Sequence, residues 1–266
     1  MKRRMALAVV FAVAFLSRMT GASASLPENR PDWLIDASSF KAMAYYDDQR
    51  KAVVMENGLV RRVVKTVPDG ATVAFDNLMT GESVIRGVKP EAKIVLDGKD
   101  YDVGGLTGQI EYAYMPPGTE ESLKPEEGAF RFSEYSIGPV KERFQWNRKR
   151  YSSNTAWPPK GKEVTFVYSA PAGAPKGISV EVHYEIYDGL PLICKWISVK
   201  NAGSGKVRLN KFISEILAAV EQQSVVEVPK VWELPDITII SDYAFGGSTG
   251  ETADKTTNWV PDPQYT

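Results

Sequence analysis

The stretch that decides the fold class of this chain is residues 178–203, ISVEVHYEIYDGLPLICKWISVKNAG. In its first half Val180, Val182 and Tyr184 alternate with polar residues, which is the period-two pattern of a strand with one solvent-facing side. The Asp-Gly dipeptide at residues 188–189 then predicts a tight hairpin turn, because it readily takes positive φ angles. The second half is apolar on both faces apart from Lys195, which is typical of a central strand covered on both sides. We therefore expect a core hairpin here.

The same kind of turn-forming dipeptide recurs through much of the chain. Asn-Gly or Asp-Gly dipeptides occur four times, at residues 57–58, 69–70, 97–98 and 188–189. The short β-like runs around the first three are residues 40–46, 52–56, 59–65, 71–75, 92–96 and 101–103. Turns of this type between β-branched runs predict an all-β fold, a large antiparallel β-sandwich of two sheets.

One apolar segment, residues 212–222, fits two structures. Ile213, Ile216 and Leu217 would share a helical face, whereas alternate residues from Phe212 would line one face of a strand. Local pattern does not choose between them. Glu215 lies within this run, and a carboxylate buried there needs a Lys or Arg partner, so a structural ion pair is favoured over catalysis.

The N-terminus has the order of an export signal. Basic residues 2–4 precede an apolar run to residue 16, and Ala-Ser-Ala at 22–24 fits a cleavage site. The run is too short to span a bilayer. Removing residues 1–24 leaves 242 of the 266 residues and takes away four basic side chains, so the formal net charge moves from −1 to about −5. We expect an exported protein, periplasmic or extracellular, with no membrane association after signal cleavage.

The rest of the chain is expected to hold an arm and one domain. Residues 25–39, with Pro27, Pro31 and Trp33, predict an arm lying on the domain, and residues 40–266 the β-sandwich itself. Residues 252–266 carry Trp259, Val260 and Tyr265 and no charged tail. This ending suggests the first part of a longer protein.

Composition excludes several kinds of chemistry. With one histidine and one cysteine, the usual zinc ligand sets cannot be built within one chain, and Cys194 cannot form an internal disulfide. A Ser-His-Asp triad would have to use His183, which sits in the middle of the predicted strand and is better read as a satisfied or solvent-facing histidine. Mild acidity without a basic tail argues against nucleic acid. We assign no catalytic residue, no metal site and no cofactor.

The best candidate surface is residues 141–162, KERFQWNRKRYSSNTAWPPKGK, with seven basic and four aromatic residues. Polar ligands with apolar ring faces, such as sugars, are met by this mixture of flat side chains and donors. The ligand-binding candidates are Trp146, Arg148, Tyr151 and Trp157. A hairpin with buried aromatics and solvated basic side chains is the structural alternative, and nucleic acid is a third, weaker one.

Several phrases together resemble a known family. They are NGLVRR at 57–62, TVAFDNLMTGES at 72–83, RFQWNRKR at 143–150, WPPKGKEV at 157–164, YEIYDGLPLICKWISVKN at 184–201 and SEILAAVE at 214–221. They resemble the N-terminal β-sandwich that precedes the catalytic barrel in bacterial α-galactosidase-like (melibiase-like) glycoside hydrolases. The resemblance covers roughly residues 38–225, and the hairpin at 178–203 is its most specific part.

The resemblance implies a two-sheet supersandwich with the general shape of galactose mutarotases. In that family the following α/β barrel carries two catalytic aspartates, which have no counterpart in this chain. The implied role is a non-catalytic scaffold that packs on its own C-terminal barrel, lines one wall of a site for a galactoside-type carbohydrate and often sits at a homo-oligomer interface. It also favours a strand over residues 212–222. Mutarotases use two histidines with a glutamate, so the single histidine excludes that activity.

Overall fold

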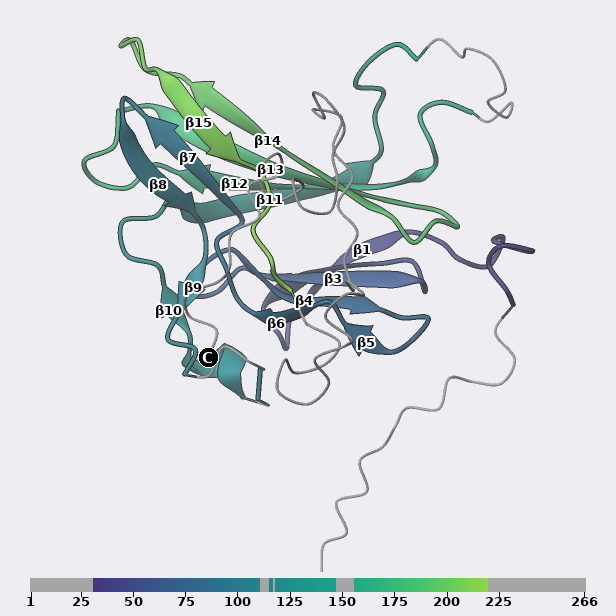
Figure 1. The fold of residues 1–266 in the computed structure, drawn as a ribbon. Coiled ribbons are helices and arrows are strands. Elements are labelled where there is room, and N and C mark those ends of the chain that lie inside the picture. Colours follow the sequence, from purple (N-terminus) through teal and green to yellow (C-terminus); the bar gives the residue numbers. More distant parts are fainter. Residues whose placement is uncertain (1–30, 111–114, 117, 147–155, 220–266) are drawn as a thin grey trace, which may run out of the picture. The chain divides into compact units, whose positions relative to one another are not determined.

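The computed structural model describes residues 31–110, 115, 116, 118–146 and 156–219 (Figure 1). The chain divides into Met1–Arg30 and Pro31–Thr266, and all of the described residues belong to the second unit. The expected signal peptide, the first part of the expected arm and the chain from residue 220 onward lie outside the described residues. The predicted cleavage site and the prediction of a longer protein therefore stay predictions.

The described residues form sixteen strands and one helix of a single turn, α1 (Thr119–Ser122), so the predicted all-β class is confirmed. Neighbouring strands pair antiparallel. The first sheet has the order β1 (Met43–Asp47), β2 (Ala52–Glu56), β3 (Val60–Lys65), β4 (Ala71–Asn77) and β5 (Glu82–Ser83). The second has the order β11 (Arg131–Pro139), β12 (Gly161–Ser169), β13 (Ile178–Tyr187) and β14 (Ile193–Asn201).

Three smaller sheets complete the described strands. A three-stranded sheet has the order β15 (Leu209–Ile213), β7 (Ala92–Leu96) and β8 (Lys99–Val103). The two-stranded sheets are β10 (Lys124–Pro125) with β9 (Leu106–Thr107), and β16 (Ala218–Ala219) with β6 (Ile85–Gly87). No described helix has the length and hydrophobicity that crossing a membrane would require.

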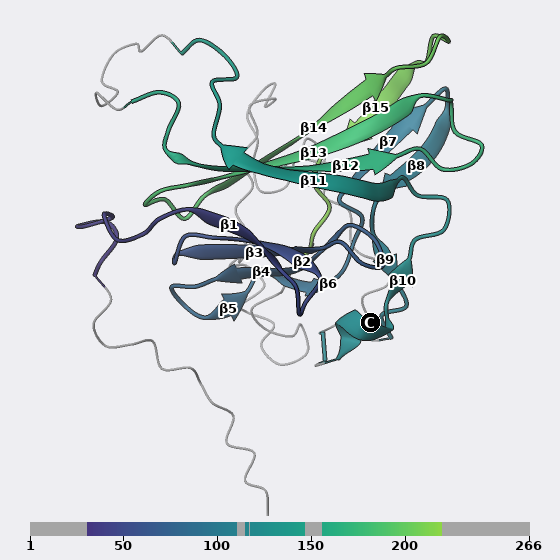
Figure 2. The same cartoon turned by 180° about the vertical axis from the view of Figure 1, so that it is seen from behind.

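The main core lies between the two large sheets, which face each other as layers in Figures 1 and 2. The first sheet contributes Val53, Met55 and Val64, and the second contributes alternate residues such as Phe166 and Tyr184. β7 and β8 close one end of this core. Because β-branched and aromatic side chains fit a pleated, half-buried surface, the apolar runs of these segments form strands. The predicted antiparallel sandwich is thus the observed architecture.

A second apolar cluster covers the other face of the first sheet. Ala52, Val54, Val63 and Val73 point away from the main core and pack on three residues of the following segments, Val88, Leu106 and Leu123. β2 and β3 are therefore buried on both faces, with only Glu56 and Arg61 partly exposed. These two strands have the two-sided burial that the sequence had suggested for residues 192–197.

The central hairpin forms, but two details of its prediction are wrong. β13 and β14 pair from Ile178 opposite Asn201 to Ile186 opposite Ile193. Their connection runs through residues 188–192 and not through a two-residue turn. β14 is an edge strand of its sheet, with its first seven residues partly exposed, because its apolar residues pack on the core on one face and meet the outer side chains of β13 on the other. Sequence pattern alone cannot separate these two situations.

The Asp-Gly dipeptide at 97–98 does form the predicted tight turn. Asp97 has a φ of 49° and Gly98 a φ of 82°, as a two-residue hairpin between β7 and β8 requires. Gly189 also has a positive φ, 71°, and an added Cβ would lie 2.7 Å from the Cβ of Ala37 in the arm. The Asp-Gly pair at 188–189 therefore serves a close approach of the arm to the end of β13.

The ambiguous segment 212–222 contains no helix in its described part. β15 ends at Ile213, an irregular stretch carries Glu215, and β16 is only two residues long. The strand prediction is correct for the two flanks. The irregular stretch between them lets Glu215 turn toward the core.

Candidate functional site

Three aromatic side chains gather in the connection between β11 and β12, and we call Phe144, Trp146 and Trp157 the aromatic cluster. The ring of Trp157 lies 5.0 Å from that of Phe144 and 5.3 Å from that of Trp146, centroid to centroid. The indole N–H of Trp157 donates to the carbonyl oxygen of Phe144 at 3.1 Å. Phe144 is 53% exposed and Trp146 39% exposed. The cluster thus presents ring surface to solvent while one of its members is held by a hydrogen bond.

The sequence predicted part of this cluster. Trp146 and Trp157, both named as ligand-binding candidates, are brought together by the fold. Arg148 and Tyr151 lie outside the described residues. Phe144 was not named, although it stands two residues before Trp146 in the same aromatic stretch. The structural alternative was a hairpin over residues 141–162 with buried aromatics. The segment connects the antiparallel strands β11 and β12, and residues 161 and 162 begin β12, but Phe144 and Trp146 are exposed and not buried.

Arg143 ties this connection to the outer face of the second sheet. Its Nε and Nη2 donate to the two carboxylate oxygens of Glu185, on β13, at 3.2 and 2.9 Å. The hydroxyl of Tyr187 donates to the same carboxylate at 2.6 Å. Burial lowers the pKa of Arg143, but the hydrogen bond and charge of Glu185 outweigh it and raise the pKa overall. The guanidinium also lies 3.9 Å from the ring centroid of Trp196.

His183 is a satisfied strand histidine, as predicted. Its ring stacks on Trp196 with centroids 4.8 Å apart and planes at 3°. Nδ1 lies 3.0 Å from the Thr165 hydroxyl, and Nε2 lies 3.1 Å from the Ser198 hydroxyl. Burial lowers the pKa of His183, and the neighbouring carboxylates Glu181 and Glu163 only partly oppose this.

This arrangement is a poor catalytic triad. The Glu163 carboxylate is 3.6 Å from Nδ1 of His183, whereas the Thr165 hydroxyl occupies the hydrogen-bonding position at 3.0 Å. A triad needs the carboxylate to hold the imidazole tautomer directly.

Metal binding is a separate question. In the described part of the chain, no group of three or more His, Cys, Asp or Glu side chains could hold a metal ion. His183 and its neighbours are therefore better explained as packing on the sheet face.

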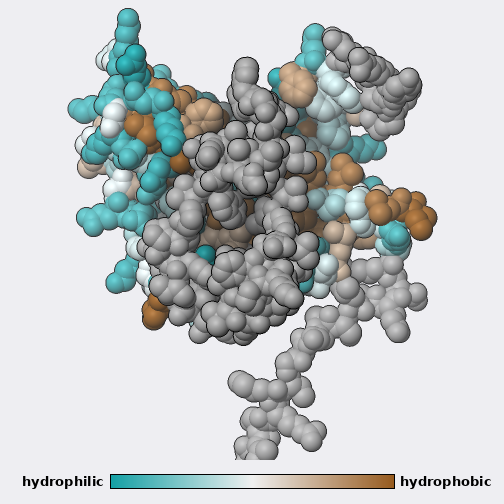
Figure 3. All heavy atoms as spheres, viewed as in Figure 1, coloured by the Kyte–Doolittle hydropathy of each residue, from teal (hydrophilic) through white to brown (hydrophobic). Residues whose placement is uncertain are grey.

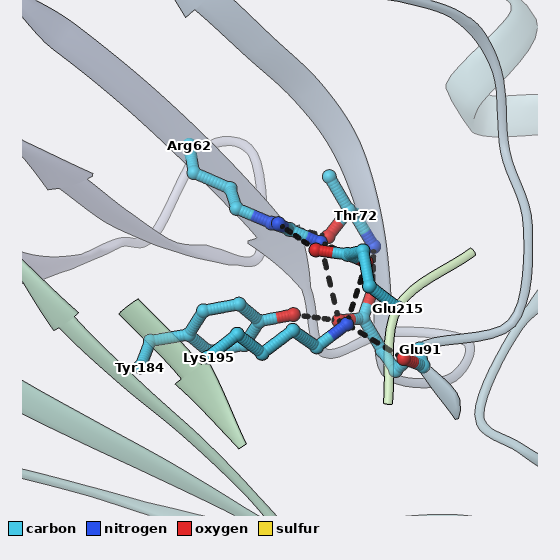
Figure 4. A network of polar contacts seen from close by, with 6 residues as sticks. All are labelled: Arg62, Thr72, Glu91, Tyr184, Lys195 and Glu215. Carbon is cyan, nitrogen blue, oxygen red and sulfur yellow. Dashed lines mark hydrogen bonds and ion pairs between the residues drawn. The ribbon is translucent and has the colours of Figure 1, made fainter. Parts of the chain in front are cut away.

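Glu215 has the partners that the sequence required. Its carboxylate accepts from Nη1 of Arg62, on β3, at 2.6 Å and from Nζ of Lys195, on β14, at 2.7 Å (Figure 4). The prediction of a structural ion pair is confirmed. Because Arg62 and Lys195 come from different sheets, Glu215 connects both layers to the segment that follows β15.

A second carboxylate, Glu91, lies at the centre of the same network. It is 1% exposed, and it accepts from the Tyr184 hydroxyl and from the backbone N–H of Thr72. Lys195 and Arg62 lie 3.4 and 3.7 Å from its Oε2. Burial alone would raise the pKa of Glu91, but these two positive charges outweigh it and lower the pKa from 4.5 to about 2. Two carboxylates thus face two cations in the interior.

A cavity lies on the other side of the first sheet. It has a volume of about 1030 Å³, and its walls include Lys65, Ile85 and Leu123. Its carboxylate Glu120 is taken by two cations, Arg50 Nη2 at 2.7 Å and Lys65 Nζ at 3.7 Å. Arg50 and Lys65 are therefore directed at a carboxylate of the protein itself, and no described aromatic ring lines the cavity. The aromatic cluster is the better candidate site.

Comparison with protein-family models, with curated proteins and with solved structures finds no match. The resemblance to the galactosidase-type β-sandwich therefore rests on the sequence phrases quoted above. The arrangement of the aromatic cluster is an independent observation.

Proposed function

We propose that this chain is the non-catalytic N-terminal β-sandwich of an exported α-galactosidase-like glycoside hydrolase, and that its aromatic cluster contacts the carbohydrate. The observation that carries the proposal is the grouping of Phe144, Trp146 and Trp157 on one connection of the sandwich, with Phe144 and Trp146 exposed to solvent. Aromatic rings pack on the apolar C–H faces of sugars, and rigid side chains lose little entropy when they do so. The resemblance supplies the galactoside as the sugar class.

A scaffold role is supported by exposed aliphatic side chains near the same end. Leu34 and Ile35 in the arm, and Leu190 and Leu192 in the β13–β14 connection, are all exposed. The end of the arm lies next to this connection, because the N–H of Gly189 donates to the carbonyl of Phe40, the residue that follows the arm, at 2.8 Å. In Figure 3, hydrophobic residues (brown) gather on the right-hand side of the molecule, where Figure 1 places the start of the described chain. Exposed apolar groups of this kind are typical of a protein contact, which fits packing on a C-terminal barrel or in a homo-oligomer.

The scaffold proposal has its own test. Extension of the expressed chain with the sequence that follows residue 266 should give a barrel with two catalytic aspartates and α-galactosidase activity. The 266-residue chain alone should show none. Hydrolysis of an α-galactoside by the shorter chain, or a following sequence that encodes no barrel, would contradict this role.

The binding proposal is tested with the chain as it stands. A panel of α-galactosides, β-galactosides and glucosides titrated into the protein should give binding for galactosides. Trp146→Ala should weaken it about tenfold, the equivalent of losing roughly 1.4 kcal/mol of ring contact. Equal affinity for every sugar in the panel, or none for any, would favour a structural role without a carbohydrate ligand.

A further inference from the structure

At its C-terminal end, β13 has buried side chains on the face of the sheet that points away from the sandwich core. From Ile178 to Tyr184 the strand alternates between buried and partly exposed residues, as a sheet with one solvated face should. The alternation then stops, and Glu185 and Tyr187 are 1% and 6% exposed although their positions continue the outer face. Something other than the sandwich core must cover these two side chains.

The group found on Glu185 is Arg143, from the start of the β11–β12 connection. Its two hydrogen bonds to Glu185 form a bidentate pair, and its guanidinium lies over the Trp196 ring. A planar guanidinium that both forks a carboxylate and stacks on an aromatic ring is held in position and orientation together. The adjacent residue in the chain is Phe144, whose carbonyl accepts the indole N–H of Trp157.

We infer that the Arg143–Glu185 pair positions the aromatic cluster, fixing Phe144 and through it Trp157 on the second sheet. Glu185 and Arg143 are positioning residues here and need not touch a ligand. The other end of the same connection is tied separately, since the N–H of Asp188 donates to the carbonyl of Lys160 at 2.9 Å, directly before β12. Arg143 is therefore the fixed point between the strand end and the rings.

The effect of this positioning on sugar affinity rests on the proposed function, because a cluster that is fixed before binding loses less conformational freedom on binding. The positioning itself does not depend on that function. Two readouts therefore test the positioning and the sugar binding separately. One follows the Trp157 indole N–H without any ligand, and the other follows galactoside binding.

The experiment compares Arg143→Lys with Arg131→Lys. Lysine keeps the positive charge next to the buried carboxylate but loses the fork and the planar stack. Arg131 makes a similar pair elsewhere, with its Nη1 3.0 Å from Oδ2 of Asp69. The two carboxylate partners are equally buried, since the side chains of Asp69 and Glu185 are each 2% exposed. Arg131 touches no member of the aromatic cluster among its described contacts. It is therefore a matched control for loss of an arginine–carboxylate pair.

Solvent exchange of the Trp157 indole N–H, measured by NMR and assigned with Trp157→Phe, is the first readout. Arg143→Lys should speed this exchange about tenfold, because it loosens the segment that carries the Phe144 carbonyl, the acceptor of the indole N–H. Arg131→Lys should leave the exchange unchanged. Tyr187→Phe, which removes one hydrogen bond to Glu185, should give a smaller change in the same direction. Equal exchange in wild type and Arg143→Lys would overturn the inference.

Galactoside affinity is the second readout. If wild type binds, Arg143→Lys should weaken binding about tenfold while Arg131→Lys retains it; unchanged binding in Arg143→Lys would overturn the positioning role. If wild type binds no galactoside but Arg143→Lys still speeds the indole exchange, the positioning inference stands and the proposed function falls.

Discussion

Arg62 and Glu215 are 153 positions apart in the sequence, yet Nη1 of Arg62 lies 2.6 Å from Oε2 of Glu215. Arg62 is 2% exposed in its side chain and Glu215 is 32% exposed. The contact holds the irregular segment between β15 and β16 against β3. Glu215 also neutralises Lys195, so its loss would leave two cations facing Glu91 alone.

Glu215→Gln should therefore destabilise the protein by about 2 kcal/mol. Removing one member of a largely buried ion pair leaves an uncompensated charge, and the partial exposure of Glu215 lets water recover some of that loss. Urea unfolding measures the change in the free energy of unfolding. Glu127→Gln, at an exposed position, is the control and should change stability by less than about 0.5 kcal/mol. Equal stability of the two variants would contradict the structural role of the network.

This network was partly predictable. A glutamate inside an apolar run required a Lys or Arg partner, but the sequence did not show that Lys195, the single charge in its apolar strand, is one of the partners. The sequence could not identify Arg62, because a charged residue in the run 60–65 reads equally well as solvent-facing. Nor could it reveal Glu91, since Glu91 follows Pro90 in what reads as a turn and is buried only when β7 packs on both sheets. Long-range pairing supplies that information.

The same limit explains the errors at the central hairpin and the gaps at the aromatic cluster. Residues 192–197 have the composition of a central strand, but strand order depends on tertiary pairing, and β14 is at an edge. The burial of Glu185 is invisible in an alternating strand, because it depends on Arg143 from a distant connection. The all-β class and the positions of β2, β3, β7 and β13, in contrast, follow from local period and turn chemistry.

Acid should weaken the protein through Glu91. Its folded pKa of about 2 lies below the ordinary value of 4.5, so the resulting stability is fully present above pH 4.5 and is lost as the pH falls toward 2. The loss over this range should be about 3 kcal/mol, at about 1.4 kcal/mol for each pH unit. Urea unfolding at several pH values between 2 and 5 measures it. Glu91→Gln should show a clearly shallower pH dependence; an unchanged slope would assign the effect to other carboxylates.

Two buried tyrosines should respond oppositely to loss of their hydroxyl groups. Among the described residues, no hydrogen-bond partner lies within reach of the Tyr168 hydroxyl, whereas the Tyr184 hydroxyl donates to Glu91. Tyr168→Phe should leave stability unchanged or raise it by up to about 1 kcal/mol, because an unpaired buried polar group is removed. Tyr184→Phe should lower it by about 2 kcal/mol, because a hydrogen bond to a charged group is lost.

Thermal and urea unfolding of the two single variants provide the comparison, and each serves as the other's control. Tyr184→Phe should also move the acid transition to higher pH, since the Tyr184 hydrogen bond helps to lower the pKa of Glu91. A destabilised Tyr168→Phe protein would show that its hydroxyl has a partner, such as a bound water molecule.

The aromatic cluster should account for most of the carbohydrate affinity. Trp157→Ala and Trp146→Ala remove ring surface at the cluster, while Phe212→Ala removes a 59% exposed ring on β15. Because stacked aromatic residues dominate small binding surfaces, the two tryptophan variants should lose affinity and the phenylalanine variant should not. All three should keep the wild-type unfolding transition to within about 1 kcal/mol if their rings serve binding more than packing.

Isothermal titration of a galactoside into wild type, Trp146→Ala, Trp157→Ala and Phe212→Ala is the most direct test of the central claim, that the cluster binds carbohydrate. We predict binding by wild type and Phe212→Ala, and affinities about tenfold lower for both tryptophan variants. Absence of binding by the wild-type protein, or equal affinities for all four proteins, would contradict the claim.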